Sequence, residues 1–215
     1  MKFCISSSIN FYKTTYPKII DSLIASGVPE KDIYFFIGGY NEYREVENSS
    51  DVRIFEVPHN SFDLTSLISV VELGIESDYW FLLHDTCFVG ENFYTFVSNF
   101  EYTQETVSLA IDGPCMNMGA YSWEFLKRNK NEIIAYKNTD YSEIGLQLAK
   151  NTAIHSEDVF LNPKIEYYNK SPRYHTEPED YYGNGAMRLV NFFDDIQLYK
   201  IQSNWFMKPK WELNL

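Results

Sequence analysis

The sequence predicts an α/β fold with a mostly parallel central sheet flanked by helices. Short apolar runs that are typical of buried strands alternate with segments of helical periodicity. The connections between them are short, and polar residues follow the ends of the apolar runs. The chain has 215 residues and shows no internal repeat or linker, so we expect a single domain spanning residues 1–215.

The first half of the chain is predicted to contain four strands and two helices. Strands are expected at residues 2–7, 32–39, 52–58 and 79–83, and the last of these runs is entirely apolar. A helix of about ten residues is expected from Tyr16, with Pro17 in its first turn and Gly27 after its end. A second helix is expected over 64–75, capped by Ser61 or Asp63. The polar stretch 40–51 is interpreted as a loop.

The second half gives weaker patterns. A short helix is expected at 92–100, a fifth strand at 106–111 and a glycine-rich loop after it. Helices are expected at 122–136 and 142–151, followed by a helix or turn at 155–161. Beyond residue 163 the chain is polar and rich in tyrosine, and it closes with strand-like or short helical segments.

Charge and composition exclude several classes of function. The formal net charge of -12 opposes binding to nucleic acid and to an anionic membrane, and a phosphate-bearing ligand would need a metal ion, backbone amides or a few placed cations. No run of about 18 apolar residues and no signal peptide is present, so we expect a soluble, cytoplasmic protein. Cys4, Cys87 and Cys115 form an odd set, which fits reduced thiols.

Candidate ligand-binding residues follow the predicted strands. The four strand exits are residues 6–8, 38–41, 59–63 and 84–87, and parallel strands would bring them to one edge of the sheet. Asp85 is the sharpest candidate, because a carboxylate that ends an apolar strand is costly if buried alone and useful if it faces a metal or a ligand. The alternative is that Asp85 caps the next turn.

The segment SDYWFLLHDTCFVG, residues 77–90, resembles the part of GT-A glycosyltransferases in which an apolar strand ends in Asp-any-Asp. Asp85 takes one acidic position, whereas the second position holds Cys87, or Leu83 if counted backwards. The resemblance implies a divalent cation, Mn²⁺ or Mg²⁺, bound by Asp85 and the donor's phosphates. His84 or His175 could add a nitrogen ligand, with a hydrogen-bonded structural histidine as the alternative. The incomplete pair leaves metal dependence open.

Two later segments extend the resemblance. HSEDVFL, residues 155–161, is similar to the segment that supplies the catalytic base in inverting members, a role that would fall to Asp158 or to Glu157. The alternative is an ordinary acidic helix start. NMGAYSWEFL, residues 117–126, is similar to the family's loop and helix beside the acceptor.

The resemblance also assigns contacts to the nucleotide. It places Ser6 and Ser7 near the ribose and base, and it places residues after the second and third strands beside them, namely Tyr40, Asn41, Asn60 and Asp63. Hydroxyl, amide and carboxylate groups can bond ribose hydroxyls and base edges, and a tyrosine ring can stack on the base. SSS and GGYN are equally good turn sequences.

Taken as a whole, the resemblance implies a single-domain, Rossmann-like GT-A fold with a nucleotide-binding half at about 1–90 and an acceptor half at about 91–215. It implies sugar transfer from a nucleotide diphosphate donor, with UDP the leading expectation, to a carbohydrate or glycoprotein acceptor during glycan synthesis. The chain is also similar in style to glycosyltransferase domains encoded by large DNA viruses of algae, which would place it in the host cytoplasm and is compatible with a longer multidomain protein.

Two other functions are weighed against this one. A sugar nucleotidyltransferase shares much of such a sheet, but SSSINFYK lacks the glycine-rich, basic loop that would cradle a triphosphate. A non-catalytic carbohydrate-binding domain would explain the aromatic content of 17%, because sugar rings stack on aromatic rings, but not the acidic residues Asp85 and Asp158 at their expected element ends.

Overall fold

A computed structural model of the chain describes residues 1–108, 118–137, 187–193 and 197–203. Its contacts group the chain into two compact units, each drawing on three segments of sequence. The first unit comprises Met1–Ile9, Pro29–His84 and Glu101–Ile165, and the second comprises Asn10–Val28, Asp85–Phe100 and Glu166–Leu215.

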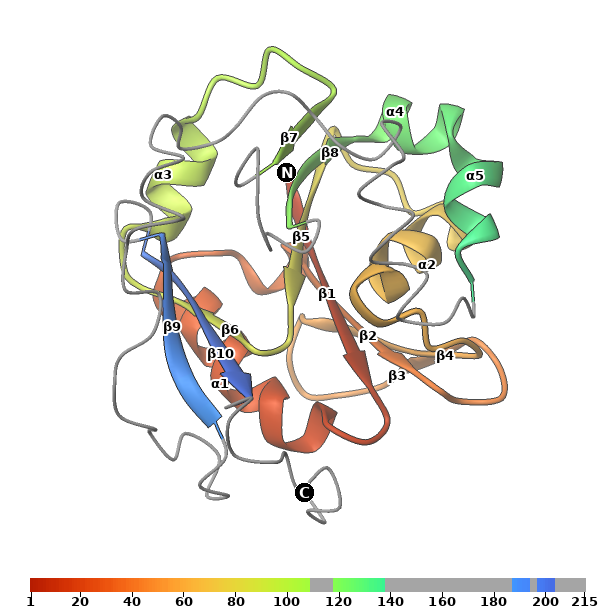
Figure 1. Cartoon of the computed structure of the whole chain (residues 1–215), viewed down its shortest axis with the longest axis horizontal. Coiled ribbons are helices and arrows are strands. Elements are labelled where there is room, and N and C mark those ends of the chain that lie inside the picture. The colour runs from red at the N-terminus through yellow and green to blue at the C-terminus, as the bar shows by residue number, and fades with distance from the viewer. Residues whose placement is uncertain (109–117, 138–186, 194–196, 204–215) are drawn as a thin grey trace. The chain divides into compact units, whose positions relative to one another are not determined.

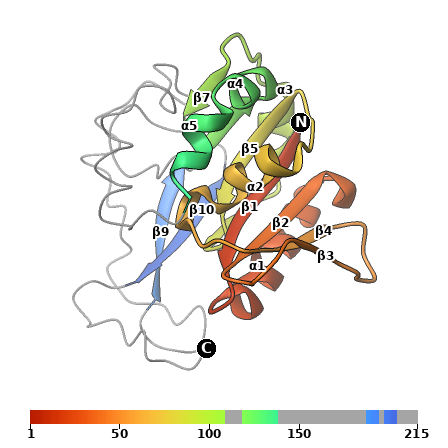
Figure 2. The same cartoon turned by 90° about the vertical axis from the view of Figure 1, so that its right-hand side faces the viewer.

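The first unit is built on a seven-stranded sheet (Figures 1 and 2). Its strands, in the order in which they lie side by side, are β3 (Arg44–Val46), β4 (Arg53–Val57), β2 (Ile33–Gly38), β1 (Lys2–Ser8), β5 (Tyr79–His84), β8 (Gly119–Ser122) and β7 (Thr106–Ser108). The four central strands β4, β2, β1 and β5 are parallel, and the outer strands β3, β8 and β7 are antiparallel to their neighbours. The predicted mostly parallel, mixed α/β sheet is confirmed.

The other described elements of the first unit are short. They are the 3-10 helices η1 (Glu30–Asp32) and η2 (Phe62–Leu64) and the α-helices α2 (Thr65–Leu73), α4 (Trp123–Arg128) and α5 (Lys130–Ala135). The predicted helix at 122–136 is therefore two helices, which meet at Asn129, where the backbone leaves the helical conformation. Ser122 caps the first of them by accepting a hydrogen bond from the Phe125 amide at 3.1 Å.

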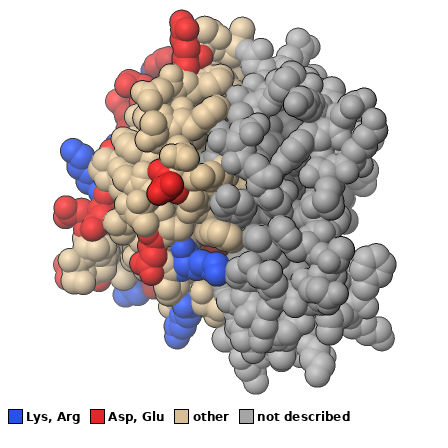
Figure 3. Space-filling model, turned by 90° about the vertical axis from the view of Figure 1, so that its left-hand side faces the viewer, with Lys and Arg blue, Asp and Glu red and all other residues tan. Residues whose placement is uncertain are grey.

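The acidic composition is visible at the surface. On the face shown in Figure 3, acidic side chains are spread over the described surface, with Lys and Arg between them. At the β3 edge the charges pair across strands, Arg44 with Glu56 and Arg53 with Glu45. No helix among the described residues has the length and apolar character needed to cross a bilayer.

The order of the strands reverses at β1. The chain runs from β1 to β2 and then to β4 on one side, whereas β5 lies on the other side of β1. In open α/β sheets, ligands bind outside the carboxyl ends of the strands at the point of such a reversal. The carboxyl ends of β1 and β5 are therefore the place to look for a site.

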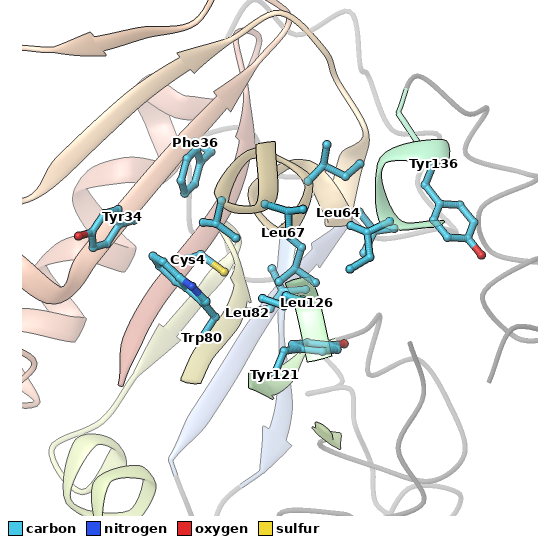
Figure 4. Close-up of a cluster of buried hydrophobic side chains, with 14 of the residues drawn as sticks. Cys4, Tyr34, Phe36, Leu64, Leu67, Trp80, Leu82, Tyr121, Leu126 and Tyr136 are labelled. Carbon is cyan, nitrogen blue, oxygen red and sulfur yellow. The ribbon is translucent and has the colours of Figure 1, made fainter. Parts of the chain in front are cut away.

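One face of the sheet packs against α2, α4 and α5 to form the main core (Figure 4). Alternate residues of the central strands supply it, including Cys4, Phe36 and Leu82. Tyr34 meets Trp80 edge to face, with ring centroids 4.9 Å apart. On the opposite face the side chains of Phe3, Ile5, Phe35, Phe81 and Leu83 are fully buried as well. Both faces of the sheet are buried, which explains why the sequences of these strands are continuous apolar runs.

Among its described residues, the second unit has two helices and a three-stranded antiparallel sheet. The helices are α1 (Tyr12–Ala25) and α3 (Phe93–Asn99), and the strands, in the order β6-β10-β9, are β6 (Cys87–Val89), β10 (Leu198–Ser203) and β9 (Met187–Phe193). α1 packs on β6, and the hydroxyl of Ser22 accepts a hydrogen bond from the Val89 amide at 3.1 Å. Next to β6, the Gly90 amide donates to the carbonyl of Gln197 at 2.8 Å.

Several element boundaries differ from the predictions. α1 begins at Tyr12, four residues before the predicted start, so Pro17 lies inside the helix rather than in its first turn. β3 lies within the predicted loop 40–51, and β6 and β8 lie where no strand was expected. These three strands have only three or four residues each, too few to show an alternating pattern.

Candidate functional site

Polar residues gather at the carboxyl edge of the four parallel strands. The register places Ser8 of β1 opposite Gly38 of β2, and Gly38 opposite Val57 of β4. On the other side of β1, Ser6 lies opposite His84 of β5. The strands therefore end at one edge of the sheet, as the sequence predicts.

Ser6 ties β1 to the start of α2. Its buried hydroxyl lies 2.8 Å from the Asp63 carbonyl, to which it donates, and 2.8 Å from the Ser66 hydroxyl, and it accepts from the Ser66 amide at 2.9 Å. The residue before α2, Leu64, has no side chain that can cap the helix, so Ser6 satisfies one of the amides left over at its first turn. In this structure Ser6 therefore positions the η2–α2 segment, and its predicted nucleotide contact stays a prediction.

Asp63 and His84 lie side by side next to Ser6. Nε2 of His84 lies 3.4 Å from Oδ1 of Asp63; the histidine side chain is 4% exposed and the aspartate side chain 21% exposed. We call Ser6, Asp63 and His84 the switch-point cluster, because β1 and β5 meet there with η2. The cluster presents a partly exposed carboxylate beside His84, on a residue whose backbone carbonyl accepts from Ser6, and such a carboxylate can accept hydrogen bonds from a ligand.

Ser8 lies at the end of β1, beyond Ser6. By strand alternation it shares the face of Ser6. Its hydroxyl oxygen is buried, and no described residue supplies a hydrogen-bond partner for it. A buried hydroxyl without a partner costs about 1–3 kcal/mol, so this position is one where a polar ligand atom would be favourable. Ser7, one of the predicted contacts, is also buried.

The exits of β2 and β4 approach each other closely. Gly39 has a φ of +102°, and its amide donates to the carbonyls of Val57 at 3.2 Å and His59 at 3.1 Å. A Cβ on Gly38 would lie 2.6 Å from the His59 carbonyl oxygen, so only glycine fits there. The predicted nucleotide contacts Tyr40 and Asn41 follow this glycine pair, with Tyr40 half-buried and Asn41 exposed.

His59 is buried next to these exits, and the predicted contact Asn60, half-buried, follows it. Its Nδ1 lies 3.0 Å from the Ser61 hydroxyl and its Nε2 3.2 Å from the Ser69 hydroxyl. Ser69 donates its own proton to the Thr65 carbonyl, so the proton between Ser69 and His59 must be on Nε2. Burial lowers the pKa of His59 to about 4, with the charge of nearby Lys137 adding to the effect and Glu72 opposing it.

Glu72 joins the neighbouring elements around His59. It accepts hydrogen bonds from the Tyr43 hydroxyl and, at 2.9 Å, from the Lys137 ammonium group. Burial alone would raise the pKa of Glu72, but these hydrogen bonds and the nearby positive charge outweigh it, so the pKa is lowered. Burial and the bond to Glu72 raise the pKa of Tyr43. The group links the residue before β3, helix α2 and the segment after α5.

Asp85 belongs to the second unit and follows His84 directly in the chain. It is half-buried, and its Oδ2 accepts a hydrogen bond of 2.8 Å from the Thr15 hydroxyl of α1. Cys87, which stands at the second acidic position of the motif, is fully buried in β6 with a free thiol. This hydrogen bond joins the Asp85 side chain to α1, and the predicted ligand-binding role of Asp85 stays a prediction.

The described residues do not assemble a metal site of their own. No three His, Cys, Asp or Glu side chains lie together so as to bind a metal ion in the part of the chain that the structure describes. Cys4 is buried with a free thiol whose pKa is raised by burial to about 12. The predicted base residues Asp158 and Glu157, and His175, lie outside the described residues.

Three features of the site escape sequence reasoning. They are the pairing of Asp63 with His84, the capping of α2 by Ser6, and the bond from Thr15 to Asp85. Each joins residues that are 21, 60 or 70 positions apart, and each depends on strand register or helix packing. The only sequence signal for these contacts is that each of the residues is polar and lies next to an apolar segment.

Comparisons with known proteins give little further evidence. No family model and no curated protein matches the chain. Similar solved structures include two of S. aureus TarS, a glycosyltransferase. TarS 1–349 has 12% identity and a TM-score of 0.38, and the match covers 60% of this chain and 49% of that chain. The second TarS structure has 10% identity and a TM-score of 0.37, with 60% and 30% covered.

The chain therefore spans less than half the length of either TarS chain. Likeness at this level carries no argument about fold or activity. The fold described above rests on the strand pairing, and the candidate site rests on the contacts of its residues.

Proposed function

We propose that the protein is a glycosyltransferase that moves a sugar from a nucleotide diphosphate donor to a carbohydrate acceptor, with UDP the first nucleoside diphosphate to test. The observation that carries the proposal is the switch-point cluster of Ser6, Asp63 and His84, at the carboxyl ends of β1 and β5 where the strand order reverses. Nucleotides bind at such reversals in open α/β sheets.

Asp63 is the proposed acceptor for a ribose hydroxyl or a base N–H. Its carboxylate is partly exposed, while its carbonyl is held by Ser6 and one carboxylate oxygen lies beside His84. A group whose position is already fixed loses little conformational freedom when a ligand binds, which favours affinity. Ser8 supports the same placement, because its buried hydroxyl gains a partner if a nucleotide binds at the end of β1.

The residues after β2 and β4 complete the proposed nucleotide site. Tyr40 would stack on the base, and Asn41 and Asn60 would bond polar edges of the base or ribose. The close approach of the two exits, through Gly38 and the His59 carbonyl, fixes the backbone from which these side chains start.

Asp85 is the residue that we assign to the diphosphate end of the donor. A carboxylate repels phosphate oxygens unless a cation lies between them, which is why Mn²⁺ or Mg²⁺ belongs to the proposal as a ligand to be tested. Since no three-residue metal cluster occurs among the described residues, no step of the reaction is assigned to the metal.

In the proposed transfer, an acceptor hydroxyl oxygen attacks the anomeric carbon of the donor sugar. The bond from that carbon to the diphosphate oxygen breaks, and the nucleoside diphosphate leaves with the bonding electrons. The proton of the acceptor hydroxyl goes to the carboxylate of Asp158 or Glu157, which the resemblance to inverting enzymes assigns as the base.

The test combines ligand binding with turnover. Thermal unfolding is measured with UDP, GDP, CDP and ADP, and with UDP-sugars, each with and without Mn²⁺. A ligand that binds the folded state raises Tm, so we expect a rise with one nucleoside diphosphate and its sugars. Turnover is measured as release of that nucleoside diphosphate. We expect Asp85→Asn and Asp158→Asn to reduce it strongly, with donor affinity kept in Asp158→Asn.

The same experiment separates the alternatives. A nucleotidyltransferase would instead form a UDP-sugar and pyrophosphate from UTP and a sugar phosphate. A carbohydrate-binding domain would be stabilised by sugars alone. If no nucleotide or nucleotide sugar raises Tm, the proposed function is wrong.

A further inference from the structure

We propose that Thr15 is a positioning residue that holds the carboxylate of Asp85 in the orientation that the donor requires. The inference rests on the proposed function and adds to it a residue of α1 that the motif around Asp85 does not contain. It concerns two residues of the same compact unit.

The contact is short and well shielded. Thr15 is 4% exposed, and its Oγ1 lies 2.8 Å from Oδ2 of Asp85 and 3.2 Å from the Phe11 carbonyl one turn earlier in α1. A hydroxyl has one proton, and the shorter bond to an ionised carboxylate is the stronger of the two. The β-branched threonine side chain has few rotamers in a helix, so its oxygen is a fixed point toward which the carboxylate turns.

The backbone that follows Asp85 is held by the same helix. Ser22 accepts a hydrogen bond from the Val89 amide at 3.1 Å, and Nζ of Lys18 lies 5.2 Å from the ring centroid of Phe88. With β6 held against α1, the hydrogen bond from the Thr15 hydroxyl restrains rotation of the Asp85 side chain.

A fixed orientation of the Asp85 carboxylate matters because it decides which of the two carboxylate oxygens faces the donor. The Thr15 bond engages Oδ2, which sets the direction of Oδ1 and of the remaining lone pairs. Partners that orient metal-binding side chains typically affect affinity or activity 10–100-fold when removed, although they touch no substrate.

The experiment removes the hydroxyl while keeping the shape of the side chain. Thr15→Val is compared with Thr15→Ser, which keeps the hydroxyl, and with Ser26→Ala as a matched control. Ser26 is also buried near the α1 end and donates only to a backbone carbonyl of the same helix, that of Leu23 at 2.8 Å. All three variants are made in the wild-type and in the Asp85→Asn background.

We expect Thr15→Val to lower kcat/KM for the donor about tenfold, and Thr15→Ser and Ser26→Ala to stay within about twofold of the wild type. In the Asp85→Asn background, Thr15→Val should cause no further loss, because the carboxylate that it orients is gone. A purely structural role would lower Tm and act equally in both backgrounds.

The outcomes separate the proposed function from the role of Thr15. If the wild type binds no nucleotide and shows no turnover, the proposed function is overturned and this inference with it. If the wild type is active and Asp85→Asn is impaired, but Thr15→Val is as active as Thr15→Ser, only the role of Thr15 is overturned. Should Thr15→Val not fold, Thr15→Ala serves in the same comparison with the same expected losses.

Discussion

His84 at the end of β5 lies with its Nε2 3.4 Å from Oδ1 of Asp63, and Ser6 of the neighbouring strand holds the carbonyl of the same aspartate at 2.8 Å. The two strands that meet at the reversal of strand order thus hold one short segment, η2, between them. Any change of register between β1 and β5 would separate these groups, because Ser6 and His84 are register partners.

The first prediction concerns Asp63. We expect Asp63→Asn to weaken binding of the nucleotide donor about tenfold, because a charged acceptor becomes an amide that forms weaker hydrogen bonds. Tm should change little, because the aspartate side chain is partly exposed. The measurement is donor affinity by calorimetry, with the exposed Asp51→Asn as the control. Equal affinity in wild type and Asp63→Asn would remove Asp63 from the site.

The central sheet could be predicted because its strands are buried on both faces. Runs such as 33–37 and 79–83 are apolar without interruption, and each is followed by glycine or polar residues. The sequence therefore predicts the parallel strands, their order along the chain and the edge at which ligands would bind. The order of the strands across the sheet depends on which strands pair with each other. A local sequence pattern does not specify that pairing.

The antiparallel edges and the contacts of the site could not be predicted. β3 has only three residues, two of them charged, and it pairs with the neighbouring strand β4, where Arg44 lies opposite Glu56. Asp63 was expected to contact a nucleotide and His84 to serve as a metal ligand, with no indication that they form a pair. Secondary-structure propensity depends on residues that are close in the sequence. These contacts join residues that are distant in the sequence, so propensity does not predict them.

The second prediction concerns Gly38. Replacing it by alanine places a Cβ 2.6 Å from the His59 carbonyl oxygen and 3.1 Å from Cα of Asn60, and both are backbone atoms that cannot rotate away. We expect a loss of about 1–3 kcal/mol in the free energy of unfolding. Donor affinity should fall too, because the exit of β4 must move.

Gly74→Ala is the matched control for Gly38→Ala. A Cβ there meets nothing within 4 Å, and only the φ of +64° disfavours alanine, at a cost of about 1 kcal/mol. Chemical denaturation and calorimetry compare the two variants. If both lose the same stability and both keep full donor affinity, the close approach of the β2 and β4 exits is not important for the site.

The third prediction concerns the ion pair of Glu72 and Lys137. Their side chains are 20% and 27% exposed, and Glu72 also accepts from the Tyr43 hydroxyl. Glu72→Gln should cost about 1–3 kcal/mol, because a partly buried ammonium group loses its charged partner. The control is Glu124→Gln, whose pair with Lys127 is 70% and 60% exposed and should matter by less than about 0.5 kcal/mol. Equal unfolding free energies for the two variants would contradict the prediction.

The fourth prediction concerns the pH dependence that His59 creates. Burial lowers its pKa from 6.5 to about 4 in the folded state, so between these values the unfolded chain binds more protons than the folded one. The contribution of His59 to stability is complete above pH 6.5 and is lost progressively as the pH falls to about 4. A difference of this size corresponds to about 3 kcal/mol, because burial disfavours the imidazolium form.

Two measurements check this prediction independently. Histidine NMR should show His59 neutral, with its proton on Nε2, down to pH 5, because Ser69 can only accept from that atom while it donates to Thr65. Chemical denaturation at pH 7.5 and pH 5 should show a smaller loss of stability in His59→Gln than in wild type, since the variant has no imidazole to protonate on unfolding. Titration of His59 near pH 6.5 in the folded protein would mean that the ring is not held neutral by Ser61 and Ser69, and the pH dependence would then arise elsewhere.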